Sequence, residues 1–589
     1  MKKNKATILT LALILFVAIF LRTYHFHDWL YFKMDQARDS LLISQAITEG
    51  AGSLPLLGPR AGATDVGEGF LRLGPAYYYF QYLSGKIFHS TDPEIFAYPD
   101  LFFSIAAILL IFFFLRLYFN NFISLLLVAL YSFSFIIIQY SRFAWNPNSL
   151  QFFAILTFFG LLKFFREKDK KRKKWWLALW AIGLFIGSQL HFFGFFMLLG
   201  ASGLFILFKF QPWKKESFAQ LGKKEFIQKI STYTLIILAV FAVTYSPVII
   251  SDIKRGGENT RNFVLALSSK PANKKKTFDE KLQRGFDENM KNYCLIITAD
   301  CYNGKYKDWG MSIKFTIFLI AFGIVLTIWR IAKTSNQDQK DFLMLVLIWL
   351  GVFFVLTVPV SYQIRPRFFI PVFLIPYILI GIFFQLLQEK AKKGGILIII
   401  GATILLLNVN AEGTRAWFGE QSKAQNKNIS PARTLILKTK DGVTLGQLER
   451  AADYIYENKK KGANIYYYIK PEHIAPFKYL FRQKNDPSFV FLPLKINTDP
   501  NAQYFAIIPS DAESQSYIEG KFNSEIKIFS EKQFGQLKVI EIDVLNRSIS
   551  QDFRFNQESG LSDRIFWSDI FGKKINRDIL QEEGINSIE

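Results

Sequence analysis

The chain has 589 residues, 51% of them hydrophobic, and it contains 62 phenylalanines. So many long apolar runs exclude a soluble globular protein. The formal net charge of +23 suggests nucleic acid as a partner. Lys and Arg gather, however, in short connectors between apolar runs, which is the positive-inside pattern of a membrane protein. We therefore expect a membrane protein with no nucleic-acid partner.

Eleven segments are apolar enough to be predicted as membrane-spanning helices. The first follows a basic N-terminus and has no small-residue cleavage site after it, so we interpret it as a retained anchor. The predicted spans are 6–23, 95–118, 122–140, 150–165, 175–190, 192–208, 231–250, 311–331, 342–360, 368–387 and 395–407.

The charge of the connectors predicts which ends of the spans face the cytoplasm. With the N-terminus inside, the connectors 166–174, 209–229, 333–340 and 390–393 also fall inside, and three of these four are plainly basic. Treating the fifth and sixth spans as one would reverse every later orientation, so we keep two. The pieces predicted outside are a first outer loop at 25–94, the 141–149 connector, a later outer loop at 251–310 and the 361–367 turn.

Residues 411–589 form a second predicted domain, which follows a membrane domain at 1–410. It contains no span-length apolar run. A helix is predicted at 445–459 and strands at 464–469, 488–494, 503–508 and 537–544. We expect a small extracytoplasmic α/β domain, in which no catalytic motif is recognised.

The only two cysteines, Cys294 and Cys301, both lie in the predicted later outer loop. An oxidising outer compartment favours a disulfide between them. Two unpaired thiols remain the alternative.

The first outer loop places acids directly after a predicted span. Asp35 and Asp39 are four residues apart, so a helix over 35–49 puts them on one face, with an apolar set beside them. Such a surface helix at the membrane boundary predicts Asp35 as a base for a hydroxyl group. The alternative is that Asp35 only caps the helix.

Aromatic and histidine side chains suggest further contacts with a substrate. Gly74-Pro75 fixes a turn before a second surface helix that carries Tyr77 and Tyr78. These rings suit a sugar-stacking platform as well as simple interface anchors. His191 lies between two short spans and is either a metal ligand or a hydrogen-bonded structural histidine.

Several arginines and acids are predicted at the outer rim, against the positive-inside trend. Forked guanidinium donors suit lipid phosphate, although snorkelling to ordinary headgroups is the alternative for the first of them. Acids at the same rim would orient substrate or hold a divalent metal, the only cofactor considered. These candidate residues are Arg142, Asp252, Glu258, Arg365 and Arg367.

Several familiar catalytic motifs are missing from the sequence. No Walker motif, Rossmann GxGxxG, HExxH, paired CxxC or GxSxG stands out. The inner connectors are also too short to form the soluble domain that a nucleotide-sugar enzyme would place in the cytoplasm.

The order of these elements over about residues 1–410 resembles the polytopic GT-C glycosyltransferases. The similar branch contains the protein O-mannosyltransferases and the aminoarabinose lipid A transferases. The resemblance rests on the first span, the Asp-containing outer loop, the Gly-Pro-x-Tyr-Tyr-Tyr helix and the Ser-Arg segment after the third span. It implies a mainly α GT-C-like fold of about eleven transmembrane helices with surface helices in the first outer loop.

The resemblance also implies roles for individual residues. The family's acidic pair is matched by Asp35 and Gln36. The resemblance therefore assigns the role of the base to Asp35, whereas an amide stands at the position of the second acid. The family's His-Pro-Pro-Leu turn is matched only by 73–76, which lacks the histidine of a metal site. Arg142 keeps the family's cation.

Together with the residues at the outer rim, the resemblance implies an inverting glycosyltransferase of the plasma membrane. It would move a sugar from a polyprenyl-phosphate donor to a hydroxyl acceptor on a glycolipid, envelope glycan or protein. A flippase or transporter of lipid-linked sugars is the alternative, disfavoured because the polar residues gather at one rim and no internal repeat is seen. A scaffold that binds a partner through its tail is the third hypothesis.

Overall fold

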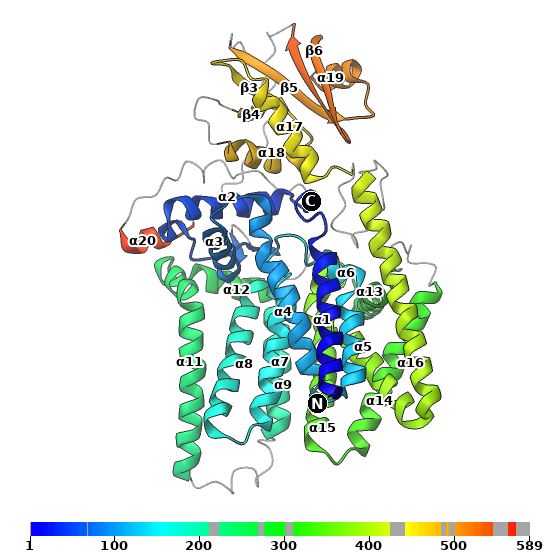
Figure 1. Cartoon of the computed structure of the whole chain (residues 1–589). Coiled ribbons are helices and arrows are strands. Elements are labelled where there is room, and N and C mark those ends of the chain that lie inside the picture. The colour runs from blue at the N-terminus through cyan, green and yellow to red at the C-terminus, as the bar shows by residue number, and fades with distance from the viewer. Residues whose placement is uncertain are drawn as a thin grey trace.

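The computed structural model describes residues 2–66, 69–210, 223–268, 276–299, 301, 310–423, 442–484, 491–493, 501–522, 524–545 and 564–572. Parts of the predicted later outer loop and tail domain lie outside these residues. A bundle of long helices runs side by side, shorter helices lie across one end of it, and a small sheet domain stands beyond them (Figure 1).

The bundle consists of mainly apolar helices. Seven helices in the described part of the chain are long and apolar enough to cross a membrane, which confirms a multi-pass membrane protein. Each of the eleven predicted segments lies mainly on a bundle helix, and eleven crossings stay a prediction. The bundle helices are α1 (Lys2–Thr23), α4 (Tyr98–Leu115), α5 (Asn121–Ser132), α6 (Phe135–Gln139), α7 (Leu150–Arg166), α8 (Lys170–Leu190), α9 (Phe192–Phe210), α11 (Lys223–Lys254), α14 (Met311–Lys333), α15 (Gln337–Thr357) and α16 (Ile375–Lys423).

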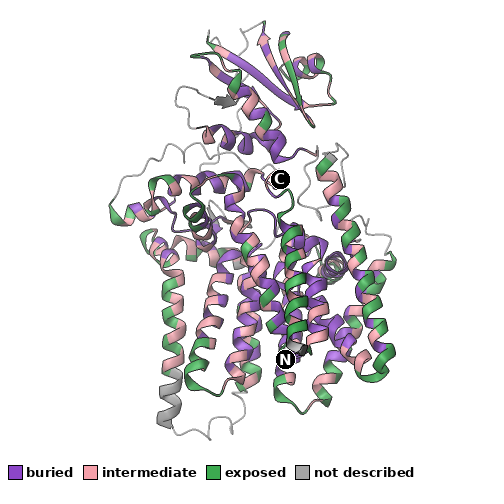
Figure 2. Cartoon of the chain, in the orientation of Figure 1, coloured by how far each residue is buried: buried purple, intermediate pink, exposed green. Residues whose placement is uncertain are grey.

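The outward faces of the bundle carry apolar side chains. On α1, Ile8, Leu13 and Phe16 are all more than half exposed. Figure 2 shows exposed residues along this helix and along the outer side of α16. Exposed apolar surface of this extent is what a helix facing lipid requires.

The predicted third span is broken in the structure. Its first part, α5, ends at Ser132, and α6 starts after Ser134. At the break, the Ser134 hydroxyl donates to the Ile296 carbonyl at 2.8 Å, and the Phe135 amide donates to Asn410 Oδ1 at 3.0 Å. Neighbouring helices therefore satisfy backbone and side-chain groups that a continuous helix would have paired internally.

Helix α16 reverses direction at Lys392. This residue has φ 42° and ψ −117°, in the left-handed half of the backbone map, so the helix cannot continue straight through it. The reversal separates the tenth and eleventh predicted spans. The second arm runs to Lys423, past residue 410, where the sequence predicts the end of the membrane domain.

The polar connectors and the surface helices lie at opposite ends of the bundle. The N-terminus, the α7–α8 and α14–α15 connectors and the α16 reversal share the lower end in Figure 1. The upper end carries α2 (Met34–Glu49), α3 (Ala76–Phe88) and α12 (Glu258–Ser268). The first two are the helices expected in the first outer loop, and their position at a membrane surface stays a prediction. The sequence missed a hairpin between α2 and α3, β1 (Arg60–Val66) paired antiparallel with β2 (Gly69–Arg72).

Shorter elements complete this end of the molecule. Cys294, at the end of α13, forms a disulfide with Cys301, which decides between the two alternatives for these residues. These elements are the 3-10 turns η1 (Ala51–Ser53), η2 (Pro93–Phe96) and η4 (Pro366–Val372) and the helix α13 (Phe278–Thr298).

The tail contains a mixed sheet in the order β4-β3-β5-β7-β6. Strand β3 is parallel to β4 and β5, while β7 is antiparallel to β5 and β6. The predicted helix at 445–459 and all four predicted strands are found; β6 and two helices were not predicted. The elements are α17 (Leu445–Glu457), β3 (Asn464–Tyr468), α18 (Pro471–Gln483), β4 (Phe491–Pro493), β5 (Ala502–Pro509), α19 (Ser514–Phe522), β6 (Ile526–Phe534) and β7 (Leu537–Val544).

The sheet domain rests on the first outer loop. Helix α18 packs against α2. Both ring nitrogens of His27 are bonded to carboxylates, Nδ1 to Glu94 at 2.9 Å and Nε2 to Glu449 of α17 at 2.8 Å. A charged histidine between two carboxylates therefore links the tail to the membrane domain.

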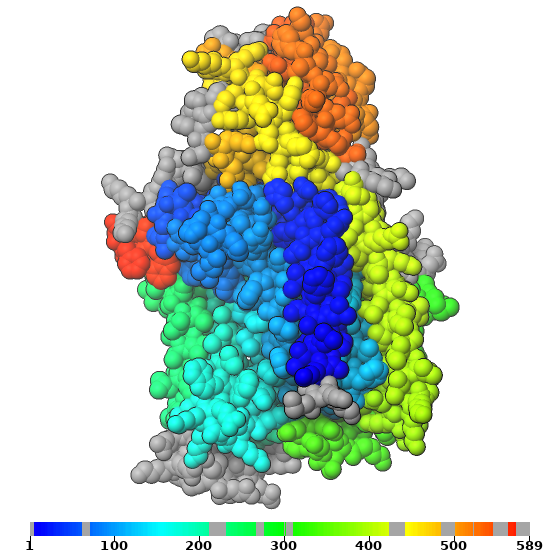
Figure 3. Space-filling view, viewed as in Figure 1, coloured from blue at the N-terminus to red at the C-terminus, as the bar shows by residue number. Residues whose placement is uncertain are grey.

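A last short piece, the C-terminal segment Arg564–Gly572 with helix α20 (Trp567–Phe571), returns to the first outer loop. Figure 3 shows it in red against the blue surface of that loop, apart from the orange sheet.

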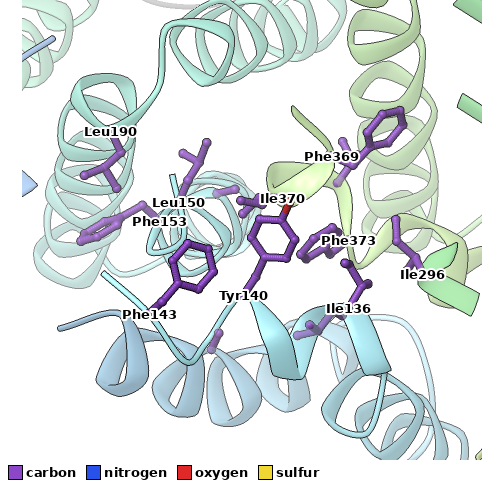
Figure 4. Packing of buried hydrophobic residues seen from close by; sticks show 14 of the residues in the cluster. Ile136, Tyr140, Phe143, Leu150, Phe153, Leu190, Ile296, Phe369, Ile370 and Phe373 are labelled. Atoms are coloured by element: carbon purple, nitrogen blue, oxygen red, sulfur yellow. The ribbon is translucent and has the colours of Figure 1, made fainter. Parts of the chain in front are cut away.

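Aromatic packing fixes the upper end of the bundle core. Tyr140 at the end of α6 lies between Phe143 and Phe373, with ring centroids 5.8 and 6.0 Å away (Figure 4). Ile370 of η4 lies beside the same ring (Figure 4). This packing holds the 141–149 connector and η4, from distant parts of the sequence, next to each other.

Candidate active site

Asp35 lies in the first turn of α2 with half of its side chain exposed. The N-cap of this helix is Lys33, whose amide donates to Gln36 Oε1 at 3.2 Å, so Asp35 is not the cap. Its Oδ1 accepts from Arg38 Nη1 at 3.1 Å, and the side chain is 52% exposed. An accessible carboxylate with one cationic partner can still meet a substrate hydroxyl.

Gln36 is the residue that the sequence resemblance matched to a second acid. Its Nε2 donates to the Ala144 carbonyl at 3.0 Å. Its oxygen accepts from the Lys33 amide, so the Gln36 side chain joins the start of α2 to the 141–149 connector. The residue therefore has a structural role that a carboxylate, which lacks a donor, could not fill.

Arg38 connects the two predicted acids. Besides Asp35, its guanidinium donates to Asp39 Oδ1, which also accepts from the Tyr78 hydroxyl at 2.9 Å. Burial raises the pKa of Asp39, and the Arg38 charge opposes that rise. Asp39 and Tyr78 are both buried, so they position Arg38 rather than meet a substrate directly.

Arg367 reaches the same region from η4. Its guanidinium lies over the Trp145 ring, 5.0 Å from the centroid. The charges of Asp35 and Arg367 both act on the Tyr31 hydroxyl, whose pKa burial raises above its ordinary value. Asp35 and Arg367, two predicted site residues more than three hundred positions apart in the sequence, therefore both lie within electrostatic reach of Tyr31.

His191 borders this region from the α8–α9 junction. Its ring packs edge-on against Phe368 with centroids 5.3 Å apart. Burial first, and the nearby Arg367 charge second, lower the pKa of His191 to about 3, so the ring is neutral at physiological pH. In the described part of the chain, no group of three His, Cys, Asp or Glu residues could hold a metal ion, which gives a metal role for His191 or Asp252 no support.

Tyr77 does not face a substrate. The side chain is buried, and its hydroxyl donates to Asp100 Oδ2 at 2.7 Å. The same carboxylate accepts from the Trp145 amide at 2.9 Å and from the Ser149 hydroxyl. Asp100, which the sequence interpretation did not single out, thus holds the connector that carries Trp145 beneath Arg367.

Arg142 also has a different role from the one predicted. Its Nη1 donates to the Leu21 carbonyl at 3.0 Å and its Nη2 to the Tyr24 carbonyl at 2.6 Å. The guanidinium lies over the Trp417 and Phe418 rings. It is buried and satisfies carbonyls at the end of α1, so it is not placed to hold a phosphate.

Asp252 and Glu258 serve the junction between α11 and α12. Asp252 accepts hydrogen bonds from the Thr260 amide at 3.1 Å and from the Thr260 hydroxyl. Glu258 pairs with Arg255 at 3.0 Å. These contacts order the start of α12, so neither acid is placed by them at Asp35. Arg365, the N-cap of η4, is partly buried two residues before Arg367.

The sequence interpretation missed three further arginines that form a cluster with Arg38. Arg60 of β1 and Arg72 of β2 are directly opposite each other in the hairpin. Burial, then the charge of Arg564, lower the pKa of Arg72, with smaller effects from Arg60 and Arg38. We call Arg38, Arg60, Arg72 and Arg564 the arginine cluster. Next to a half-exposed carboxylate, it is the electrostatic environment that a phosphate-bearing substrate requires.

Comparison of the fold with solved structures agrees with the architecture. ArnT from Cupriavidus metallidurans in the apo state has a TM-score of 0.51 at 11% identity, covering 92% of this chain and 98% of that one. Its structure bound to undecaprenyl phosphate gives a TM-score of 0.50 over 93% and 99% of the two chains, also at 11% identity.

The chain has the GT-C fold.

The family comparison agrees with this assignment. Residues 67–247 match the model of the dolichyl-phosphate-mannose-protein mannosyltransferases, which confirms the resemblance drawn from the sequence. The Archaeoglobus fulgidus oligosaccharyltransferase, solved with zinc and sulfate, matches this GT-C protein with a TM-score of 0.47 at 13% identity over 86% of this chain and 68% of that one. No curated protein matches it by sequence.

Proposed function

We propose that this GT-C protein is an inverting membrane glycosyltransferase. It moves a sugar from a polyprenyl-phosphate donor to a hydroxyl acceptor at the extracytoplasmic face of the plasma membrane. The surface helices, the arginine cluster and the tail domain then share that face, and the basic connectors face the cytoplasm.

The observation that carries this proposal is the surrounding of Asp35. A half-exposed carboxylate stands on a surface helix at one end of the bundle, with Arg38 bonded to it and Arg367 close by. A base next to cations, at one end of the helix bundle, matches the needs of transfer from a lipid phosphate.

The reaction follows from these positions. The Asp35 carboxylate accepts the proton of the acceptor hydroxyl, and the acceptor oxygen attacks the anomeric carbon from the side opposite the phosphate. The bond from the anomeric carbon to the phosphate oxygen breaks with its electron pair, and polyprenyl phosphate leaves. One displacement inverts the configuration of the anomeric carbon.

The leaving phosphate gains one negative charge as this bond breaks. Arg38, which is bonded to Asp35, and Arg367, whose charge acts on the nearby Tyr31, stabilise that charge more in the transition state than in the bound donor. The Trp145 ring packs against the Arg367 guanidinium, and Asp39, which also accepts from Tyr78, accepts a hydrogen bond from Arg38. The predicted phosphate role of Arg142 thus passes to Arg38.

The comparisons support a lipid-linked donor. The matching family is described by transfer of mannose from dolichyl phosphate to protein. ArnT, which shares this fold, was solved bound to undecaprenyl phosphate. The sugar and the acceptor are left open by both.

The test is Asp35→Asn in membranes supplied with a radiolabelled polyprenyl-phosphate sugar. Loss of a general base lowers the rate by about a hundredfold to ten thousandfold. Asp28→Asn is the matched control, because its side chain is 50% exposed and lies in the same loop. Full transfer by Asp35→Asn would remove the proposed mechanism, and lipid flux without transfer by the wild type would favour the flippase.

A further inference from the structure

The C-terminal segment is attached to the first outer loop by backbone and side-chain hydrogen bonds. The Leu56 amide donates to the Ile565 carbonyl at 2.9 Å, and the Trp567 amide donates to the Leu54 carbonyl at 3.1 Å. The indole Nε1 of Trp567 donates to the Tyr79 hydroxyl at 2.9 Å. This pairing fixes the start of the segment beside α3, where the site residue Tyr78 also lies.

Arg564 is the first described residue of this segment, and it enters the site. Its side chain is buried, with 7% of the residue exposed, and its guanidinium lies over the Tyr78 ring at 5.8 Å. Its charge also acts on the Tyr78 hydroxyl. Within the described ranges nothing accepts a hydrogen bond from its Nε or Nη1. Two buried charged donors without an acceptor are strongly unfavourable unless an anion binds them.

The surroundings of Arg564 are positively charged. Its charge acts on Arg72, and Arg38 and Arg60 belong to the same cluster. Asp39 attracts Arg564 as well, but Asp39 Oδ1 already accepts from Arg38 and Tyr78. The four arginines of the cluster therefore carry more charge than Asp35 and Asp39 alone balance, and like charges repel strongly where water is excluded. The cluster as a whole is suited to an anion.

We propose that Arg564 binds the phosphate of the lipid-linked donor, together with Arg72, so that the C-terminal segment completes the donor site of this enzyme. The inference rests on the proposed function and extends it to a residue far from the membrane domain in sequence. A guanidinium donates charge-assisted hydrogen bonds to phosphate, and Nε and Nη1 of Arg564, which lie on different sides of its guanidinium, are both available as donors.

This placement gives the tail a role in substrate binding. Phosphate bound between Arg564 and Arg72 lies next to Arg38, and through Arg38 it lies next to Asp35. The departing phosphate gains charge in the reaction, so the same arginines bind the released polyprenyl phosphate more tightly than the neutral lipid alcohol. Variants of Arg564 should thus change binding of phosphate-bearing ligands without changing binding of the alcohol.

The test measures binding to the purified full-length chain in detergent by isothermal titration. The probes are a short-chain polyprenyl phosphate, the matching polyprenol and inorganic phosphate. Arg564→Gln should lower the affinity for polyprenyl phosphate by about ten- to a hundredfold, because charge-assisted hydrogen bonds are lost. Arg564→Lys keeps the charge but loses the planar set of guanidinium donors, and it should lower the same affinity by about fivefold. Phe571→Ala is the control, since this side chain in the same segment is exposed.

The outcomes separate this inference from the proposed function. If binding of inorganic phosphate depends on Arg564 as binding of the lipid does, the site recognises phosphate itself. If only binding of the lipid depends on Arg564, the prenyl chain contributes to recognition. Unchanged lipid affinity in Arg564→Gln, or in Arg564→Lys should the first variant fail to fold, overturns the inference even if transfer continues. Binding that depends on Arg564 without any sugar transfer would instead remove the proposed function alone.

Discussion

Asp100 offers a test of how the site is held in place. This residue of α4 is fully buried, and its carboxylate accepts from the Tyr77 hydroxyl, the Trp145 amide and the Ser149 hydroxyl. Asp100→Ala removes the acceptor of all three hydrogen bonds at once. The change leaves these three donors, two of them on the buried residues Tyr77 and Ser149, without their acceptor and loosens the connector on which Arg367 rests.

The size of the effect follows from these three contacts. A buried donor left without its acceptor costs about 1–3 kcal/mol, and bonds to a charged acceptor lie at the upper end. Removal of the buried carboxylate itself offsets part of this cost, because the charge no longer needs desolvation. We expect Asp100→Ala to lower the free energy of unfolding by roughly 3 kcal/mol. Asp100→Asn, which keeps one acceptor oxygen, should lose less.

This loss is measured by thermal unfolding in detergent, in which the fraction of protein that stays monodisperse is recorded at each temperature. Asp92→Ala is the matched control, because its carboxylate accepts from the Ser90 hydroxyl at 2.6 Å at an exposed position. Exposed substitutions of this kind stay within about 0.5 kcal/mol. An unfolding temperature of Asp100→Ala equal to that of the wild type, or an equal fall in Asp92→Ala, would refute the reasoning.

Two further predictions concern stability. Hydrogen bonds to Glu449 and then Glu94 raise the pKa of His27 from 6.5 to about 10. The stabilising link to the tail is thus complete below about pH 6.5 and is lost as pH rises through 10, so the excess unfolding temperature of wild type over His27→Gln should shrink over that range, and a constant difference would contradict it. The Cys294–Cys301 disulfide closes a short loop, so Cys294→Ser with Cys301→Ser should cost about 2.5 kcal/mol in chemical unfolding, and unchanged stability would be the contrary result.

The sequence predicted those parts of the site that depend on local pattern. A polar segment directly after an apolar run gave Asp35 on a surface helix, and hydropathy placed all eleven apolar segments on helices. The tail strands followed from runs of β-branched and aromatic residues. The hairpin β1–β2 was missed because its strands are short and rich in small and charged residues, which resemble a loop.

Residues whose role depends on packing could not be predicted in this way. Arg142 follows a membrane boundary like a headgroup-binding residue, yet its side chain turns inward to carbonyls of α1. Tyr77 and Tyr78 are neighbours in sequence, but helix geometry directs one to Asp100 and the other to Asp39. Arg564 carries no local signal, because only the return of the C-terminal segment places it beside Tyr78.

The measurement that tests the central claim most directly is the sidedness of the two ends of the bundle. Both native cysteines are in the disulfide, so single cysteines introduced as Asp28→Cys and Lys171→Cys can be labelled selectively. A membrane-impermeant maleimide applied to intact cells should label position 28, in the first outer loop, and reach position 171 only after permeabilisation. Labelling of position 171 in intact cells, or protection of position 28 there, would contradict transfer at the outer face.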